Sequence, residues 1–344
     1  MIHFECDYNE GAHENVLRRL SQTNAEQTSG YGEDGYCAQA AEKIRSLCEA
    51  PNAQAHFLVG GTQANATVID AALRPHQGVL SAHTGHIAVH ETGAVEACGH
   101  KVLTLPGADG KITAAQIAAA VDEHWADPSF EHIVQPGMVY LSHPTELGTL
   151  YSLAELQEIS RVCREKCLFL FVDGARLAYG LAARGADVTL PELAKRCDVF
   201  TFGGTKAGAL FGEAVVITNP AIAKDFRYLI KRHGGMLAKG RLLGLQFLAL
   251  LENDLYLSLG NHAIAQAGRI RDAFAAVGIP LAFDSPANLL FPILTKAQAD
   301  YLQTKYAFYL IDPLDNNRYI SRFCTSWATR PEDVEQLTND IRKL

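Results

Sequence analysis

The fold is decided by two stretches of the chain, Leu168-Phe-Leu-Phe-Val-Asp-Gly-Ala-Arg176 and Cys197-Asp-Val-Phe-Thr-Phe-Gly-Gly-Thr-Lys206. Each stretch contains an apolar run that predicts a buried strand. The first strand ends on Asp173, and the second runs through two glycines into Lys206. The carboxyl ends of parallel strands carry the ligand loops of an α/β sheet, so we expect the acid and the lysine to share a site there.

A carboxylate and a lysine in this arrangement are the two groups that a pyridoxal phosphate (PLP) site requires. The lysine amine forms a Schiff base with the cofactor, and the carboxylate keeps the pyridine nitrogen protonated so that the ring withdraws electrons. Alternatively, Asp173 could cap a helix and Lys206 could be a solvated loop lysine. Gly203, Gly204 and Gly208 favour the cofactor site, because they let a ligand approach closely and a solvated lysine needs no such room.

A second glycine-containing turn predicts an anion site. His56-Phe-Leu-Val-Gly-Gly-Thr-Gln63 reads as a strand, a glycine pair and the start of an apolar helix that reaches Leu73. Amides at a helix start lack intrahelical partners, and the helix dipole favours a phosphate there. The alternative is a plain turn followed by a helix cap, because the pattern is neither of the common phosphate-loop motifs.

The sequence resembles a known family of PLP enzymes. Phe171-Val-Asp-Gly-Ala-Arg176 together with Phe202-Gly-Gly-Thr-Lys206 is similar to the threonine aldolase and β-eliminating lyase family, and the resemblance spans nearly the whole chain. It implies an aspartate-aminotransferase-like fold in which Lys206 carries the cofactor and Asp173 pairs with its ring nitrogen. We expect Arg176 near the phenolic oxygen or the phosphate of PLP, the alternative being a buried Asp–Arg pair. The other expected cofactor-binding residues are Gly61, Thr62, Gln63, His86 and Thr201.

Three histidines follow the predicted anion site, and two functions compete for them. His83, His86 and His90 have a spacing that would place three imidazoles on one helix face, as in a metal site. No cysteine or carboxylate cluster completes a metal shell, so we expect no metal. The family resemblance instead assigns His86 to stacking on the PLP ring and moving protons, with Glu91 orienting it. His83 and His90 are then structural.

Three residues are expected to bind the substrate. Arg322 lies on a predicted strand near the C-terminus, where the family places an arginine that holds the substrate carboxylate through paired hydrogen bonds. Tyr31, in a turn-rich loop, resembles a family residue that reaches the active site of the neighbouring subunit, although a loop tyrosine that anchors a turn is the alternative. Glu146 follows a predicted strand and is the second candidate for the catalytic base, after His86.

Some positions depart from the family. The lysine segment differs from the usual aldolase segment, Cys6 stands where the family has a serine that helps to hold the substrate carboxylate, and Thr145-Glu146 occupy the loop where a second imidazole is expected. These departures affect the preference at the β-carbon and the identity of the base. Asp173, Arg176 and Lys206 are unaffected.

Composition limits the classes of function. The chain has 344 residues, with 48% hydrophobic and 20% charged residues, as in a globular protein with room for a large and a small domain. Its net charge of −8 argues against nucleic acid as a partner. We expect no signal peptide and no membrane span. The eight cysteines form no paired motif and favour buried thiols in a reducing cytoplasm.

The order of the expected elements predicts an α/β protein. We expect an N-terminal arm and helix over residues 1–45, a large PLP-binding domain with a mostly parallel sheet flanked by helices over 46–253, and a small α+β domain over 254–344. The expected activity is PLP-dependent retro-aldol cleavage of β-hydroxy-L-amino acids, such as threonine, allo-threonine or phenylserine-type substrates, in a homodimer or homotetramer with active sites at the subunit interface. A β-eliminating amino-acid lyase and a non-catalytic scaffold of the same fold are the alternatives.

Overall fold

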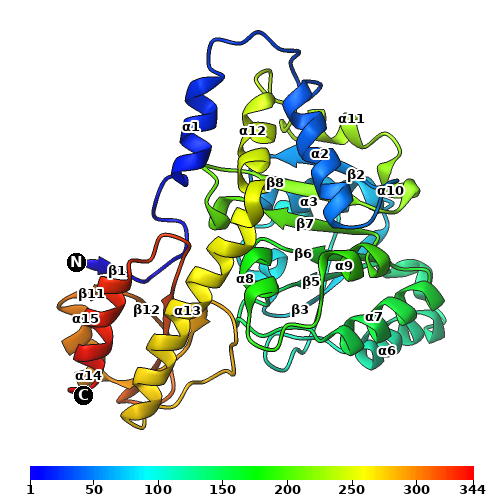
Figure 1. Cartoon of the computed structure of the whole chain (residues 1–344). Coiled ribbons are helices and arrows are strands. Elements are labelled where there is room, and N and C mark those ends of the chain that lie inside the picture. The colour runs from blue at the N-terminus through cyan, green and yellow to red at the C-terminus, as the bar shows by residue number, and fades with distance from the viewer.

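The computed structural model describes residues 1–344, and a seven-stranded sheet forms its centre (Figure 1). The strand order is β2-β8-β7-β6-β5-β3-β4. From β7 to β4 all neighbours are parallel, whereas β8 is antiparallel to both of its neighbours, so the prediction of a mostly parallel sheet is confirmed. The strands are β2 Gln54–Leu58, β3 Gln77–Ala82, β4 Val102–Leu105, β5 Gln135–Ser142, β6 Phe169–Asp173, β7 Val199–Gly203 and β8 Glu213–Ile217.

Helices cover both faces of this sheet, because its strands are apolar on both sides. Val172, Phe200 and Val216 point to the larger of two apolar clusters, and the residue before each of them points to the smaller. The larger cluster includes α2 Gly35–Leu47, α6 Ala114–Ala126, α7 Leu153–Glu165, α8 Leu177–Ala182, α9 Leu190–Arg196 and α12 Arg241–Leu250. The smaller includes α3 Gly61–Ala72, α4 His86–Val89, α5 Ala94–Ala97, α10 Pro220–Ala223 and α11 Phe226–Arg232.

Two helices of the larger cluster begin at side-chain caps. The Thr113 side chain caps α6, and Ser152 caps α7 with Glu155 completing a capping box. These caps start two helices that pack on the same face of the sheet.

The C-terminal region is a separate small sheet with its own core, as Figure 1 shows at one end of the molecule. Its strands pair antiparallel in the order β10-β13-β12, and β9 also pairs with β13, so the predicted α+β region is confirmed. The elements are β9 Leu289–Leu290, β10 Ile293–Thr295, α14 Lys296–Gln303, β11 Tyr306–Ala307, β12 Tyr309–Pro313, β13 Arg318–Cys324 and α15 Pro331–Ile341.

Two segments connect the large and small regions. Strand β1, Ile2–His3, pairs in parallel with β11, so the start of the expected arm lies with the C-terminal region, while α1 Glu14–Gln22 packs on α12. Helix α13, Leu255–Ala276, packs on both α8 and α15. Gly260 permits this packing, because a Cβ there would lie 2.3 Å from the carbonyl oxygen of Ala178.

No single helix of the structure is long and apolar enough to cross a membrane. Taken together, α12 and the stretch Glu252–Ala276, which meet at 65°, reach that length and composition.

Candidate active site

The site lies at the carboxyl edge of the central strands, where the chain leaves β6 and β7. Asp173 is the last residue of β6, and Lys206 lies just beyond β7 in a short 3-10 turn, Thr205–Ala207. The two strand ends approach closely, since the Gly203 amide donates to the Gly174 carbonyl oxygen at 3.0 Å. A Cβ on Gly203 would lie 2.4 Å from the Ala175 carbonyl oxygen, which explains the glycine.

Asp173 is a buried, fully hydrogen-bonded carboxylate. Its Oδ2 accepts from the Tyr140 hydroxyl at 2.6 Å and the Asn65 amide at 2.9 Å, and its Oδ1 accepts from the Ala175 backbone amide at 2.8 Å. Burial alone would raise the pKa of Asp173, but these hydrogen bonds and the charge of His86 outweigh it and lower the pKa. The group is therefore an anion at neutral pH, as a partner of a pyridinium must be.

His86 belongs to the same network. Its Nδ1 lies 2.8 Å from Oε1 of Glu91, which also accepts from the Asn65 amide at 2.7 Å. Burial lowers the pKa of His86, but the hydrogen bond to Glu91 and the charges of Glu146 and Asp173 outweigh burial and raise it. The prediction that Glu91 orients His86 therefore has a geometric basis. Asn65, which joins the two carboxylates, lies one helical turn after Gly61, and that spacing could have revealed it.

The structure does not place His83, His86 and His90 on one helix face, so the geometry considered for a metal site is absent. His83 follows the end of β3, and its Nδ1 accepts from the Gly107 amide at 3.1 Å, whereas His86 begins a four-residue helix that ends before His90. The Thr84-Gly85 turn between them prevents a common helix face. No group of three side chains in the structure is placed to hold a metal ion.

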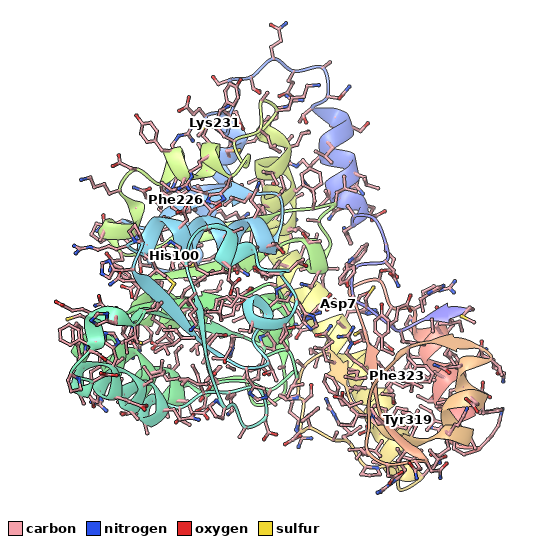
Figure 2. The ribbon with its side chains drawn as sticks, turned by 180° about the vertical axis from the view of Figure 1, so that it is seen from behind. Asp7, His100, Phe226, Lys231, Tyr319 and Phe323 are labelled. Atoms are coloured by element: carbon pink, nitrogen blue, oxygen red, sulfur yellow. The ribbon has the colours of Figure 1, made fainter.

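Arg176 has a partner that the sequence did not indicate. Its Nε and Nη2 donate to the two carboxylate oxygens of Asp7, at 2.7 and 3.1 Å, and its Nη1 lies 3.8 Å from Glu146. Asp7 is fully buried and also accepts from the Asn288 amide at 2.9 Å. Arg176 therefore does form a buried Asp–Arg pair, but its partner is Asp7. Asp173 does not pair with Arg176, because neutral donors already fill its hydrogen bonds. Figure 2 shows Asp7 between the part of the chain built on the seven-stranded sheet and the C-terminal region.

The predicted phosphate turn is open. Cβ atoms added to Gly60 or Gly61 would meet nothing within 4 Å, and Thr62 is exposed at the first turn of α3. Gln63 instead braces the turn, accepting from the Val59 amide and donating to the His233 carbonyl oxygen. Thr201 likewise accepts from the Gly174 amide at 2.7 Å, beside Asp173. An open helix start, an anionic Asp173 and a nearby lysine together fit PLP.

Arg322 is partly buried on β13. Its Nη2 donates to the Glu5 carbonyl oxygen at 3.3 Å, its guanidinium lies over the ring of Tyr309 at 4.9 Å, and its buried Nε has no partner. The vacant donor fits the predicted carboxylate-binding role. Cys6 lies close by on the N-terminal segment and donates to Asn9.

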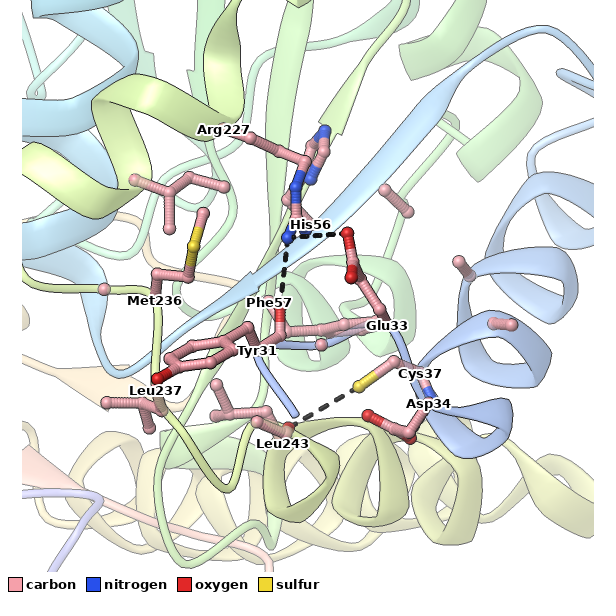
Figure 3. A pocket seen from close by; sticks show the side chains of 17 residues that line it. Tyr31, Glu33, Asp34, Cys37, His56, Phe57, Arg227, Met236, Leu237 and Leu243 are labelled. Carbon is pink, nitrogen blue, oxygen red and sulfur yellow. Dashed lines mark hydrogen bonds and ion pairs between the residues drawn. The ribbon is translucent and has the colours of Figure 1, made fainter. Parts of the chain in front are cut away.

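Tyr31 lines a different cavity, of about 280 Å³, which contains neither Asp173 nor Lys206 (Figure 3). Its carbonyl oxygen accepts from Arg227, its ring lies 5.1 Å from the ammonium of Lys231, and it is 47% exposed. Within one chain Tyr31 is therefore not brought to the lysine. Nearby, Arg241 at the start of α12 donates to the carbonyl oxygens of Thr23 and Glu26.

Two further residues near Lys206 were missed. The ring of Tyr8 lies 6.0 Å from its ammonium, and Glu213, the first residue of β8, is a buried carboxyl group beside it. Glu213 sits in an otherwise apolar strand, and a lone acid in such a run is the signal that could have identified it.

Comparisons with known proteins identify the family of this chain. The profile of the β-eliminating lyase family matches residues 9–295. A low-specificity L-threonine aldolase of Pseudomonas aeruginosa is 31% identical over 98% of this chain and 96% of its own length, and one of a Pseudomonas species is 31% identical over 99% and 97%.

Comparison with solved structures indicates the same family and its fold. A threonine aldolase of Leishmania major superposes with a TM-score of 0.97 and 42% identity, covering 100% of this chain and 99% of its own. An aspartate aminotransferase of Thermus thermophilus shares the fold alone, with a TM-score of 0.73 at 14% identity. The chain therefore belongs to the β-eliminating lyase family of PLP-dependent enzymes, as its sequence predicted.

Proposed function

We propose that this protein cleaves β-hydroxy-L-amino acids by a retro-aldol reaction, converting L-threonine or L-allo-threonine to glycine and acetaldehyde. The observation that carries the proposal is the network that joins Asp173, Asn65, Glu91 and His86 at the edge of the sheet where Lys206 follows β7. It combines an anion for the cofactor ring with an oriented imidazole that can move protons. The names of the relatives, threonine aldolases, support the same reaction.

The residues have separate tasks in this proposal. When bound, PLP supplies an electron sink for the bond that breaks at the substrate α-carbon. Lys206 holds the cofactor, Asp173 keeps a proton on its ring nitrogen, and the start of α3 holds its phosphate. Arg322 binds the substrate carboxylate with its free Nε.

His86 is the proposed base for the substrate β-hydroxyl group. Its Nδ1 is engaged by Glu91, and its Nε2 has no hydrogen-bond partner in the protein. Glu146, which is 18% exposed and 3.8 Å from Arg176, is the second candidate. A base whose pKa lies near the operating pH is best suited to accept a hydroxyl proton and return it later.

We infer that the active form is a homodimer or homotetramer, in which the loop of Tyr31 reaches the neighbouring subunit. Tyr31 is exposed and lies outside the lysine site of its own chain, as that role requires. A large PLP-binding domain over 46–253 and a small domain over 254–344 complete the proposal. The eight unpaired thiols fit a reducing compartment such as the cytoplasm.

Product analysis with L-threonine tests the reaction. Acetaldehyde and glycine support the aldolase, whereas 2-oxobutanoate and ammonia would show β-elimination and contradict it. Lys206→Ala should abolish turnover and covalent PLP binding, while Lys224→Ala, at an exposed lysine, should leave both unchanged. Wild-type turnover in the Lys206 variant would overturn the proposal.

A further inference from the structure

Tyr140 is a buried tyrosine whose hydroxyl group has one partner, the carboxylate of Asp173. It is 1% exposed, and its hydroxyl donates to Oδ2 of Asp173 at 2.6 Å. Its neighbours on β5, Val139 and Leu141, are apolar, and phenylalanine would fill the same space. A hydroxyl group buried in an apolar core is unfavourable unless it is hydrogen-bonded. The hydroxyl of Tyr140 therefore serves Asp173 rather than the packing of the core.

The sheet brings Tyr140 to Asp173. Strands β5 and β6 are parallel neighbours in which Tyr140 lies opposite Phe171, and the two rings pack edge to face, with their centroids 5.4 Å apart at 82°. Phe171 and Asp173 are two residues apart on β6, so their side chains leave the same face of the sheet. The packing against Phe171 therefore directs the hydroxyl of Tyr140 along the neighbouring strand to the carboxylate.

Tyr140 is a permanent donor to this carboxylate. Burial, followed by the negative charges of Asp173 and Glu91, raises the pKa of Tyr140 well above its usual value, so the hydroxyl keeps its proton. The distance of 2.6 Å is typical of an O–H group that donates to a charged oxygen, which is a strong class of hydrogen bond. The amide of Asn65 donates to the same Oδ2 at 2.9 Å. Two donors on one oxygen stabilise the ionised form of Asp173 and lower its affinity for a proton.

We propose that Tyr140 is a positioning residue for the cofactor: its hydroxyl holds the carboxylate of Asp173 in place and keeps the proton of the pair on the ring nitrogen of PLP. This inference deepens the proposed function and rests on the pairing of Asp173 with that nitrogen. One proton lies between the two groups, and it resides on the more basic of them. A carboxylate that already accepts from Tyr140 is the weaker base, so the proton stays on the nitrogen, where it makes the ring an electron sink.

Tyr140→Phe tests this role, because it removes one oxygen and keeps the ring that packs on Phe171. In the apoprotein with isotope-labelled aspartate, the carboxyl signal of Asp173 is titrated by NMR, and Asp173→Asn identifies that signal. Loss of a donor should raise the pKa of Asp173. With nitrogen-labelled PLP bound, the ring-nitrogen signal should move from the protonated toward the unprotonated position. On L-threonine, kcat should fall about tenfold with KM little changed, because Tyr140 binds no substrate.

Tyr306→Phe is the matched control. Tyr306 is also fully buried, and its hydroxyl donates to a carboxylate oxygen, Oδ2 of Asp340, at 2.8 Å, but it lies in the C-terminal region. This variant should lose stability as Tyr140→Phe does and should leave the Asp173 titration, the ring-nitrogen signal and kcat unchanged. A ring-fluorinated tyrosine at position 140 is a stronger donor, so it should lower the pKa of Asp173 further. That measurement decides the role if Tyr140→Phe does not fold.

The outcomes are distinguishable. An unchanged Asp173 titration and an unchanged ring-nitrogen signal in Tyr140→Phe would overturn the role of Tyr140. Equal changes of both signals in Tyr306→Phe would also overturn it, since they would report a general loosening of the protein. A wild type that binds PLP but releases no acetaldehyde from L-threonine would instead overturn the proposed function and leave the role of Tyr140 to the two signals.

Discussion

Asp173 makes the clearest prediction at the scale of single residues. Asp173→Asn keeps the shape of the side chain but removes the negative charge that faces the cofactor ring. We expect turnover to fall on the order of 100-fold, the size typical of one preorganised electrostatic partner, with PLP still bound. Steady-state kinetics and the cofactor absorbance measure the two effects. Loss of the cofactor itself would contradict this division of tasks.

The His86–Glu91 pair predicts a shift in the pH profile. Because Glu91 contributes to the raised pKa of His86, Glu91→Gln should lower that pKa. A base must be unprotonated, so the acid limb of kcat/KM should move to lower pH in the variant. Profiles of wild type and variant on L-threonine test this, and Glu96→Gln, on α5, is the control. An unmoved acid limb would show that His86 is not the base.

At the scale of elements, the contact between the ends of β6 and β7 fixes the lysine. Gly203→Ala forces a Cβ against the backbone oxygens of Ala175 and Gly174, at 2.4 and 2.7 Å, and backbone cannot yield cheaply. We expect a loss of about 1–3 kcal/mol in the free energy of unfolding, together with weaker PLP attachment. Denaturant unfolding of the apoprotein measures the first effect.

Gly268→Ala is the matched control for this substitution. Gly268 lies within α13 and has nothing within 4 Å of an added Cβ, so alanine should stabilise the helix by about 0.5–1 kcal/mol. If both variants behaved alike, the close approach of β6 and β7 would not be what requires Gly203.

At the scale of the whole molecule, Asp7 connects three distant parts of the chain: the N-terminal segment, Arg176 before α8, and Asn288 before β9. Asp7→Ala leaves Arg176 buried without its main counter-ion, so we expect a loss of about 3–5 kcal/mol in the free energy of unfolding. Glu165→Ala breaks an exposed pair with Arg161 and should cost below about 1 kcal/mol. A similarly small loss in the free energy of unfolding for Asp7→Ala would contradict the structural role of Asp7.

The pKa of Asp7 adds a pH dependence to this contact. Burial opposes ionisation, but the charges of Arg176 and Lys206 outweigh it and lower the pKa. A lowered pKa gives stability that is present above the unfolded value, about 3.9, and is lost as the pH falls through the folded value. The difference in stability between wild type and Asp7→Ala should therefore shrink in acid.

The sequence by itself determined most of the elements and the placement of Asp173 and Lys206 at the ends of two neighbouring strands. Strands, turns and helix caps are specified by residues that are close in sequence. The positions of Asp173 and Lys206 at the ends of β6 and β7, the glycine turn at Gly61 and the caps at Thr113 and Ser152 could therefore be predicted. Local pattern also carried the family resemblance and hence His86 and Arg322.

Only the tertiary structure decided which polar groups meet. Asp7 reaches Arg176 across 169 positions, and Asn65 reaches Asp173 across 108. Such pairs form only when distant strands and segments pack together, and no periodic pattern in the sequence indicates which of them will meet. Burial, likewise a property of the packed molecule, separates the two acids of this edge, because it leaves Asp173 surrounded by donors and Glu213 with a bare oxygen.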